Sequence, residues 1–201
     1  VGCYAWANDN STLFYAKHDP ETLRSDKIFR TDVHKDDFGE QMVYREKDEK
    51  FDTFVYRSRS QAYVIIVSSS SISDEYRFLS TDRPKDEFQL FQPRQDHLEY
   101  SIEHKDDTFY ILTNADKADN FKLMTTPVDR TARENWQVFQ DHDTDILLED
   151  VDVFADFIVL SERSKGLNHL KVIPQDQPDD AYYIPIQSET YTLGTSVNPL
   201  M

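Results

Sequence analysis

Four aspartates in the second half of the chain have the spacing of a calcium-binding loop. Asp141, Asp143, Asp145 and Asp152 match the first, third, fifth and twelfth positions of a helix-loop-helix calcium site. That site needs glycine at its sixth position, where this chain has Ile146. Because Ile146 and the two leucines after it should enter a strand, we interpret the segment as a solvated connection between strands. We therefore assign no metal ligand.

The sequence shows no arrangement of residues that would support nucleophilic catalysis. The glycines, at positions 2, 39, 166 and 194, are too scattered for a phosphate-binding loop or for the Gly-x-Ser-x-Gly turn of a catalytic serine. Cys3 has no base visibly placed to activate it and is interpreted as a small core residue. A single cysteine also excludes a disulfide framework. The six histidines are scattered, so we assign no catalytic residue and no cofactor.

Two further motifs have both a functional and a structural interpretation. Charged residues on or beside strands, Glu149, Glu162 and Arg163, would either face solvent or line a central channel, and the first is favoured. Asn10-Ser11-Thr12 is a glycosylation acceptor triplet, which matters only in a secreted protein. A tight turn at residues 8–10 explains this triplet better.

The composition restricts the classes of partner. The chain has 201 residues, with 38 acidic against 22 basic side chains and a formal charge of −16. Such a charge argues against nucleic-acid binding, which needs clustered Lys and Arg, and it fits a cationic partner. An aromatic content of 13% argues against disorder. No apolar stretch approaches the roughly 20 residues of a membrane span, and no signal peptide is evident, so we expect no membrane partner.

The elements that would position these residues are nearly all strands. Short runs rich in Phe, Tyr, Val, Ile and Leu alternate with turn-forming clusters, and only residues 131–137 could hold a helical turn or two. The runs fall into four groups of four. The expected strands are Cys3–Trp6, Leu13–Lys17, Lys27–Asp32 and Met42–Arg45; Thr53–Arg57, Tyr63–Ser68, Glu75–Leu79 and Phe88–Phe91; Glu99–His104, Thr108–Thr113, Phe121–Thr126 and Trp136–Gln140; and Leu147–Phe154, Phe157–Glu162, Asn168–Ile173 and Tyr182–Ile186.

The grouping repeats at a nearly constant interval. The second strand of each group recurs at steps of 50, 46 and 48 residues, counted from Leu13, Tyr63, Phe109 and Phe157. A four-stranded unit at this period is typical of a β-propeller blade, whereas a β-sandwich predicts no fourfold grouping. Each second strand is apolar at nearly every position, as expected for a strand between neighbouring blades. We place the repeats at approximately residues 1–46, 51–92, 98–140 and 146–187, with a further blade starting at 190–201.

Several stretches resemble one enzyme family in the same order. Residues 3–9 with Leu13-Phe14-Tyr15 look like a blade start in the oligopeptidase B (protease II) branch of the prolyl oligopeptidase family. The other similar stretches are Val43–Asp48 with Phe51, His97–Ser101, Thr113-Asn114 with Asn120–Leu123, and Glu162-Arg163 with Gly166-Leu167. The resemblance covers essentially the whole chain.

The resemblance implies a role that the repeat alone does not. Members carry a catalytic α/β-hydrolase domain and a seven-bladed N-terminal propeller that admits only short peptides, and the oligopeptidase B branch cuts after Lys or Arg. The chain would be about four blades of that propeller, without the catalytic domain. No position matches the family's catalytic residues, and the substrate-binding residues remain unassigned. Val1–Tyr4 and Lys50–Asp52 correspond to stretches that approach substrate in relatives.

The expected function is therefore the gating of a peptidase that acts on short basic peptides, in contact with its own catalytic domain and in the cytoplasm. The chain alone should be inactive and could self-associate through blade faces exposed at its ends. The alternatives are a non-catalytic interaction propeller and the propeller of a prolyl-specific relative.

Overall fold

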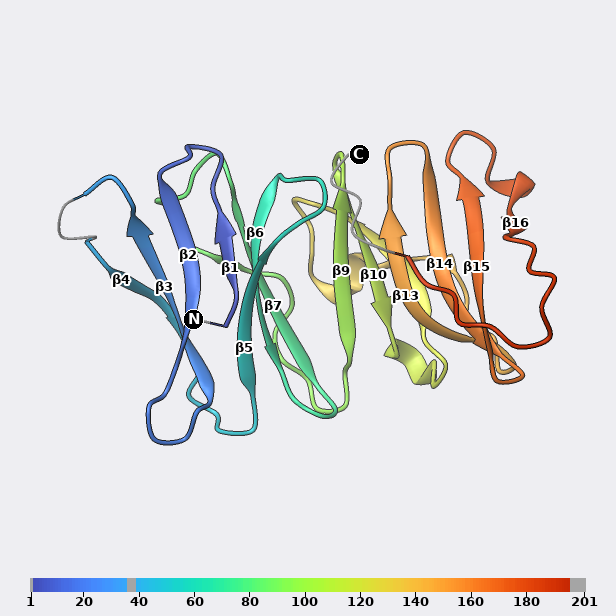
Figure 1. Ribbon diagram of the computed structural model, residues 1–201, viewed down its shortest axis with the longest axis horizontal. Coiled ribbons are helices and arrows are strands. Elements are labelled where there is room, and N and C mark those ends of the chain that lie inside the picture. The colour runs from blue at the N-terminus through green and yellow to red at the C-terminus, as the bar shows by residue number, and fades with distance from the viewer. Residues whose placement is uncertain (1, 36–38, 196–201) are drawn as a thin grey trace. The chain divides into compact units, whose positions relative to one another are not determined.

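The computed structural model describes residues 2–35 and 39–195, which fold into four antiparallel sheets of four strands each (Figure 1). The chain divides into two compact units, Val1–Leu98 (unit 1) and Glu99–Met201 (unit 2). In every sheet the strands lie side by side in chain order, so each sheet is a simple up-and-down meander. This confirms the expected all-β fold of four-stranded blades.

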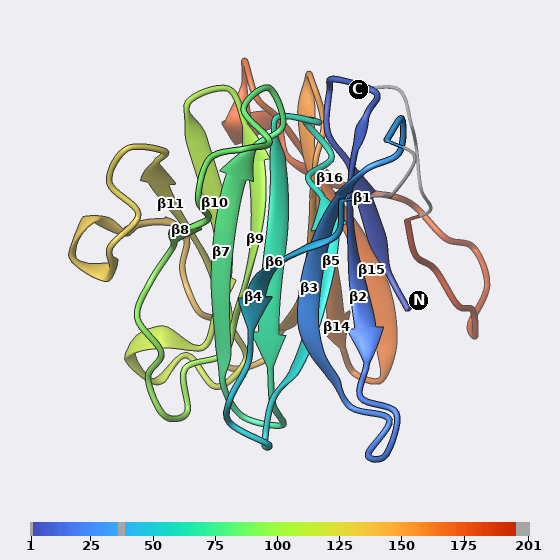
Figure 2. The same ribbon diagram turned by 90° about the vertical axis from the view of Figure 1, so that its left-hand side faces the viewer.

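Unit 1 contains the first two sheets. Their strands are β1 (Tyr4–Trp6), β2 (Thr12–His18), β3 (Ser25–Asp32) and β4 (Gln41–Arg45), followed by β5 (Asp52–Arg57), β6 (Tyr63–Ser69), β7 (Asp74–Ser80) and β8 (Gln89–Leu90). The long strands β2 and β3 run side by side in Figure 2. Phe14, Ala16 and Ile28 of the first sheet form one buried cluster with Val64 and Ile66 of the second. The apolar side chains on the facing sides of these strands therefore join the two sheets of unit 1 through one core.

Unit 2 contains the other two sheets. Their strands are β9 (Tyr100–Lys105), β10 (Thr108–Thr113), β11 (Lys122–Pro127) and β12 (Gln137–Gln140), followed by β13 (Leu147–Val153), β14 (Phe157–Ser164), β15 (Leu167–Pro174) and β16 (Tyr182–Tyr183). Leu112 and Leu123 of the third sheet pack with Leu148, Ile158 and Leu160 of the fourth. A second, smaller cluster on the fourth sheet is built around Val159, Leu170 and Val172.

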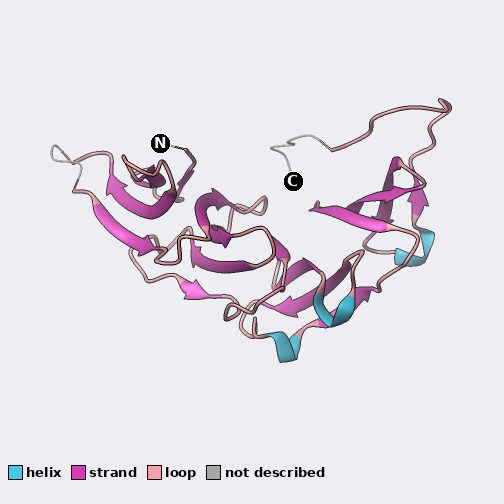
Figure 3. Ribbon diagram, turned by 90° about the horizontal axis from the view of Figure 1, so that it is seen from below, coloured by secondary structure: helices cyan, strands magenta, loops and turns pink. Residues whose placement is uncertain are grey.

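One tight turn between strands uses a glycine. β14 and β15 are joined by a two-residue turn, Lys165-Gly166, whose residues have φ values of 51° and 80°. Positive φ at both positions matches the right-handed twist of the strands, and glycine adopts it without strain. Three short 3₁₀ helices, η1 (Ala115–Lys117), η2 (Arg133–Asn135) and η3 (Pro178–Asp180), are the helices of the described ranges, and all lie in unit 2 (Figure 3). The expected helical turn within residues 131–137 is η2.

The observed strands agree with those expected from the sequence, except for the fourth strands of two sheets. Two fourth strands, expected at Phe88–Phe91 and Tyr182–Ile186, are only the two-residue strands β8 and β16. Such short edge strands offer little backbone for unwanted pairing. Residues 190–195 form no strand, and residues 196–201 lie outside the described part, so the further blade stays a prediction.

The burial of the second strands differs between sheets. Every residue of β6 from Val64 to Ser68 is buried, as expected for a strand with both faces covered. β2 instead alternates, because Phe14 and Ala16 enter the core while Tyr15 and Lys17 lie on the other, partly exposed face. The expectation of burial on both faces is therefore correct for β6 and wrong for β2. Within residues 2–35 and 39–195, no helix is long and apolar enough to cross a membrane.

Candidate functional site

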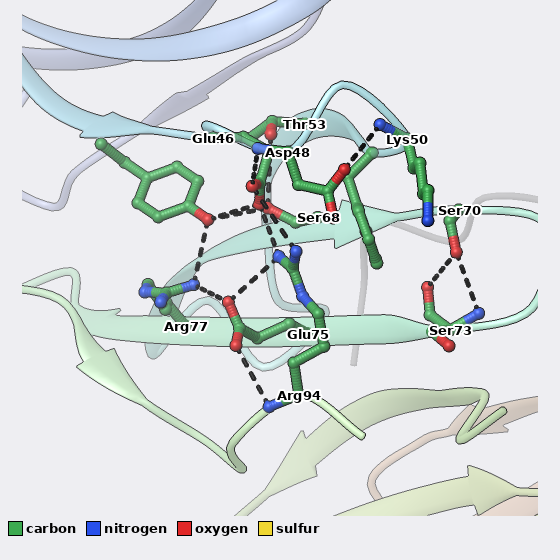
Figure 4. A network of polar contacts seen from close by, with 12 residues as sticks. Glu46, Asp48, Lys50, Thr53, Ser68, Ser70, Ser73, Glu75, Arg77 and Arg94 are labelled. Carbon is green, nitrogen blue, oxygen red and sulfur yellow. Dashed lines mark hydrogen bonds and ion pairs between the residues drawn. The ribbon is translucent and has the colours of Figure 1, made fainter. Parts of the chain in front are cut away.

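The densest polar network of unit 1 surrounds the guanidinium of Arg94 (Figure 4). Nη2 of Arg94 lies 2.5 Å from Oε2 of Glu46 and 3.3 Å from Oε1 of Glu75. The backbone N–H of Arg94 also donates to Glu75, at 3.2 Å. The guanidinium lies over the Phe51 ring, 3.6 Å from its centroid. One planar cation thus joins two carboxylates and an aromatic face.

A second arginine completes this network, which we call the Arg94 cluster and define as Tyr44, Glu46, Ser68, Glu75, Arg77 and Arg94. Nη1 of Arg77 donates to Glu75 at 2.6 Å and to the Tyr44 hydroxyl at 3.2 Å. That hydroxyl donates to Glu46 at 2.9 Å and lies 3.0 Å from the Ser68 hydroxyl. The two carboxylates and the two guanidinium groups balance, so the cluster has no net charge. We call such a charge-balanced network closed.

The surroundings of Glu46 stabilise its ionised form. Glu46 is only 5% exposed, and burial alone would raise the pKa of its carboxyl group. Hydrogen bonds from Arg94, from the Asp48 amide and from Tyr44 outweigh this effect and lower the pKa to about 2. Burial acts in the same sense on Tyr44, whose pKa is raised. The cluster therefore holds Glu46 as a carboxylate at any ordinary pH.

The loop between β4 and β5 is what brings Glu46 to this position. Arg24 holds the loop by donating to the carbonyl oxygens of Phe51, at 2.8 Å, and of Asp48, at 2.5 Å. The Asp48 carboxylate accepts from the Lys50 amide at 3.0 Å, which closes a local turn. Arg24 and Glu46 also line a cavity of about 610 Å³ on this side of the unit, together with three further acids and two further bases. Because four acids and three bases line it, the cavity has no single preferred sign of ligand.

Unit 2 has a polar network at the equivalent strand positions. Glu162 is the sixth residue of β14, as Ser68 is of β6. In the next strand, Lys171 stands two residues beyond the partner of Glu162, where Arg77 stands two residues beyond the partner of Ser68. Unit 2 therefore places a carboxylate on the second strand, where unit 1 has a serine.

Glu162 is 1% exposed and is held by neutral groups. The Tyr183 hydroxyl donates to Oε2 of Glu162 at 2.8 Å, and the Gln140 amide donates to Oε1 at 3.2 Å. Lys171 donates to Oε1 of Gln140 at 2.9 Å, so the Gln140 amide stands between the ammonium group and the carboxylate. Burial, followed by the hydrogen bond to Glu162, raises the pKa of Tyr183 to about 12.

A cavity of about 220 Å³ borders Glu162, and we call it the Glu162 pocket. Its walls come from Phe121 just before β11, from the end of β12, from the loop between β12 and β13, and from all four strands of the fourth sheet. The lining residues are Phe121, Gln140, Asp141, His142, Asp143, Ile146, Leu148, Glu162, Lys171 and Tyr183. Asn120 fixes the loop by donating to the carbonyl oxygens of Asp143 and Thr144, at 3.1 and 2.8 Å.

The aspartates of the calcium-like motif do not converge. Asp141, Asp143 and Asp145 are exposed in the loop between β12 and β13, and β13 begins at Leu147 as expected. Asp152 is buried within β13. Strands, rather than helices, flank the loop, and nowhere in residues 2–35 and 39–195 do three or more His, Cys, Asp or Glu side chains form a set of metal ligands.

The charged residues of the fourth sheet separate into two environments. Glu149 and Arg163 form an exposed ion pair of 2.6 Å, and Asn168 also donates to Glu149, at 2.8 Å. The favoured expectation that Glu162 faces solvent is wrong, because its side chain is 1% exposed and is enclosed by Gln140 and Tyr183. Sequence reasoning missed the partners of Glu162, although a carboxylate inside an apolar second strand was the available signal.

The remaining singled-out residues have structural roles. Cys3 packs against the core of unit 1 and accepts a hydrogen bond from the Val55 amide at 3.1 Å. The side chain of Asp9 accepts from the amides of Ser11 and Thr12, at 3.0 and 2.8 Å, and Asn10 has a φ of 52°. The triplet is thus part of the expected tight turn. Of the two stretches assigned to substrate approach, Lys50–Asp52 borders the Arg94 cluster, while Val1 lies outside the described residues.

The successive four-stranded meanders define the β-propeller class, and comparison with known proteins gives the family. The family described as prolyl oligopeptidase, N-terminal beta-propeller domain, matches residues 1–199. The chain therefore belongs to this family.

Individual proteins and a solved structure are also similar to this chain. Dipeptidyl aminopeptidase BI of Pseudoxanthomonas mexicana is 35% identical over 96% of this chain and 26% of its own length, and Protease 2 of Moraxella lacunata is 28% identical over 86% and 24%. Oligopeptidase B from Trypanosoma brucei, solved with covalently bound antipain in a closed form, superposes with a TM-score of 0.86 at 27% identity, covering 95% of this chain and 28% of that one. The chain thus spans about a quarter of the length of these relatives.

Proposed function

We propose that this chain is the substrate-gating propeller segment of an oligopeptidase B-like serine endopeptidase that cleaves short peptides after Lys or Arg. The observation that carries the proposal is the family match over residues 1–199, together with the similarity to the trypanosomal oligopeptidase B over 95% of the chain. In the parent protein, the chain would pack against the parent's own catalytic domain. The Arg94 cluster would serve this role indirectly, by fixing the loop that precedes β5.

Two physical effects would make up the gating. Closely packed four-stranded sheets exclude folded proteins and leave passage for extended peptides. A formal charge of −16 in this segment would also attract peptides that contain Lys or Arg. The attraction should weaken with salt, since the Debye length shortens from about 10 Å at 0.1 M to about 3 Å at 1 M.

A second candidate activity has one observation in its favour. The relative with 35% identity is named a dipeptidyl aminopeptidase, so the parent could release dipeptides from free amino termini. An assay of the full-length parent separates the two. Hydrolysis of an amino-blocked peptide that ends in Arg before a chromophore supports the endopeptidase, whereas hydrolysis only of the unblocked dipeptide supports the aminopeptidase.

Two controls test the parts of this proposal. The 201-residue chain alone should not cleave the Arg substrate, and turnover by the pure chain would contradict the claim that the chemistry lies elsewhere. In the full-length parent, kcat/KM for the Arg substrate should fall as ionic strength rises. A flat salt profile would count against electrostatic attraction but not against steric gating.

The other proposed properties follow from the same assignment. A non-catalytic interaction propeller and a prolyl-specific parent are the competing assignments, and cleavage after Pro would favour the latter. The cytoplasm is the compartment proposed for the parent, which cell fractionation would test. The isolated chain is also proposed to self-associate through the first sheet, where Tyr4, Tyr15, Phe29 and Met42 form one cross-strand row and Tyr4 is 65% exposed. A clean monomer in light scattering would contradict this.

A further inference from the structure

The Glu162 pocket combines a fully buried carboxylate with open volume. Glu162 is 1% exposed, and among the described residues its hydrogen-bond donors are the uncharged groups of Tyr183 and Gln140. Burying a carboxylate without a paired cation is costly, and the cost falls when a cation takes the neighbouring space. A volume of about 220 Å³ is that of several water molecules, since each takes about 30 Å³ in the liquid.

The charges of the lining favour a cation. Three carboxylates, those of Asp141, Asp143 and Glu162, face one ammonium group, that of Lys171. The ammonium group is directed to Gln140. His142 also lines the pocket, and its Nε2 is buried with no hydrogen-bond partner in the part of the chain that the structure describes. As an acceptor, this nitrogen can take a hydrogen bond from an N–H of a bound cation.

Unit 1 shows which kind of cation binds at the equivalent strand positions. There the guanidinium of Arg94 binds Glu46 and Glu75 and lies on the Phe51 ring. The Glu162 pocket offers the same kinds of group: buried and exposed carboxylates, and the aromatic rings of Phe121 and Tyr183. What it lacks, within the described ranges, is a guanidinium of its own.

We propose that the Glu162 pocket is a binding site for an external guanidinium group, such as the side chain of an arginine derivative. The guanidinium would take the place of the Gln140 amide as the hydrogen-bond donor to Glu162, because Gln140 and Tyr183 enclose this carboxylate in the unbound chain. Asp143 at the exposed rim supplies a second carboxylate. The planar group donates several hydrogen bonds in a fixed fork, which a compact ammonium group cannot reproduce. This site is independent of the proposed peptidase activity, because it concerns binding to the chain itself.

The test is calorimetric titration of the 201-residue chain with N-acetyl-arginine amide. The neutral citrulline counterpart, which has nearly the same shape, is the matched ligand control. The arginine derivative should bind at least about ten-fold more tightly than the citrulline one, because hydrogen bonds between charged groups are stronger than those to a neutral group. Equal binding of the two, or no binding of either, would overturn the proposal.

Variants locate the site. Glu162→Gln should weaken binding of the arginine derivative about ten-fold or more, whereas Glu149→Gln should change it less than about two-fold. Glu149 is the matched control, since it lies in the same sheet, has its own partner in Arg163 and changes the net charge equally. Equal effects of the two substitutions would reduce the binding to general electrostatic attraction and contradict the site.

A second variant keeps the proposal testable if Glu162→Gln does not fold. Asp143 is exposed, so Asp143→Asn should leave the fold intact while weakening binding of the arginine derivative measurably. The derivative should also raise the thermal midpoint of the wild-type chain more than that of the variant, because a ligand stabilises only the state that binds it. An unchanged affinity of Asp143→Asn would place the ligand elsewhere.

Discussion

The Arg94 cluster and the Glu162 pocket occupy equivalent strand positions in the two units but have opposite electrostatic designs. In unit 1 two carboxylates meet two guanidinium groups, and Glu46 is ion-paired within 2.5 Å. In unit 2 a more deeply buried carboxylate is held by a hydroxyl and an amide, beside an open cavity. The same fold thus places a closed ion network in one unit and an open one in the other.

The difference shows that the repeat determines where a polar network lies between two sheets. It does not determine which residue types form the network. In both units, polar side chains of the second and third strands of the later sheet meet a side chain of the fourth strand of the sheet before it, in one polar volume. Arg94 fills this volume in unit 1. In unit 2, the residue types leave the volume open, which is the basis of the proposed guanidinium site.

Removing Arg94 should have the largest effect on stability. Arg94→Ala leaves Glu46 and Glu75 buried with one cation fewer, and breaking a buried ion pair costs about 3–5 kcal/mol. Because the Arg94 side chain is 23% exposed, we expect a loss near 3 kcal/mol, the lower end of that range. Urea unfolding would measure it. The two tryptophans, Trp6 in unit 1 and Trp136 in unit 2, allow each unit to be followed in a background where the other is Phe.

Arg94→Lys is the matched control for charge. A lysine keeps the positive charge but cannot donate to both carboxylates in a fork, so it should recover only part of the lost stability. Full recovery would mean that charge alone, and not the planar geometry, holds the cluster.

Acid should weaken unit 1 through Glu46. Its pKa is about 2 in the folded state against an ordinary value of 4.5, so the stabilisation is complete above pH 4.5 and is lost as the pH falls toward 2. A shift of this size corresponds to about 3 kcal/mol at most. Stability measured from pH 6 to pH 2 should fall more steeply in the wild type than in Glu46→Gln. Parallel profiles would show that Glu46 is not responsible.

The exposed ion pair of the fourth sheet should have the smallest effect. Glu149 and Arg163 are 2.6 Å apart, but their side chains are 27% and 47% exposed. Such pairs contribute about 0.2–1 kcal/mol, so Arg163→Ala should cost less than about 1 kcal/mol. A loss of stability as large as that of Arg94→Ala would contradict the expected difference between buried and exposed ion pairs.

The strands could be predicted from the sequence because local apolar runs determine them. Tyr63–Ser68, for example, is expected from its composition and is observed as β6. The polar networks could not be predicted in the same way, because their partners are far apart in the chain. Glu46 and Arg94 are separated by 48 residues, about one repeat, and only the packing of successive sheets brings them together. The fourth strand β8 is shorter than expected because Phe88 and Phe91, on either side of it, enter the core from outside a strand.

The same substitution made in both networks gives the most direct test of the contrast between them. Glu46→Gln should lower the free energy of unfolding by about 2 kcal/mol, because Arg94 loses a charged partner. Glu162→Gln should leave it unchanged or raise it, because an uncharged group of the same shape relieves a buried carboxylate that has no direct cation. Urea unfolding of both variants, each followed by its own tryptophan, gives the comparison. Equal losses in the two variants would contradict the distinction between a closed and an open network.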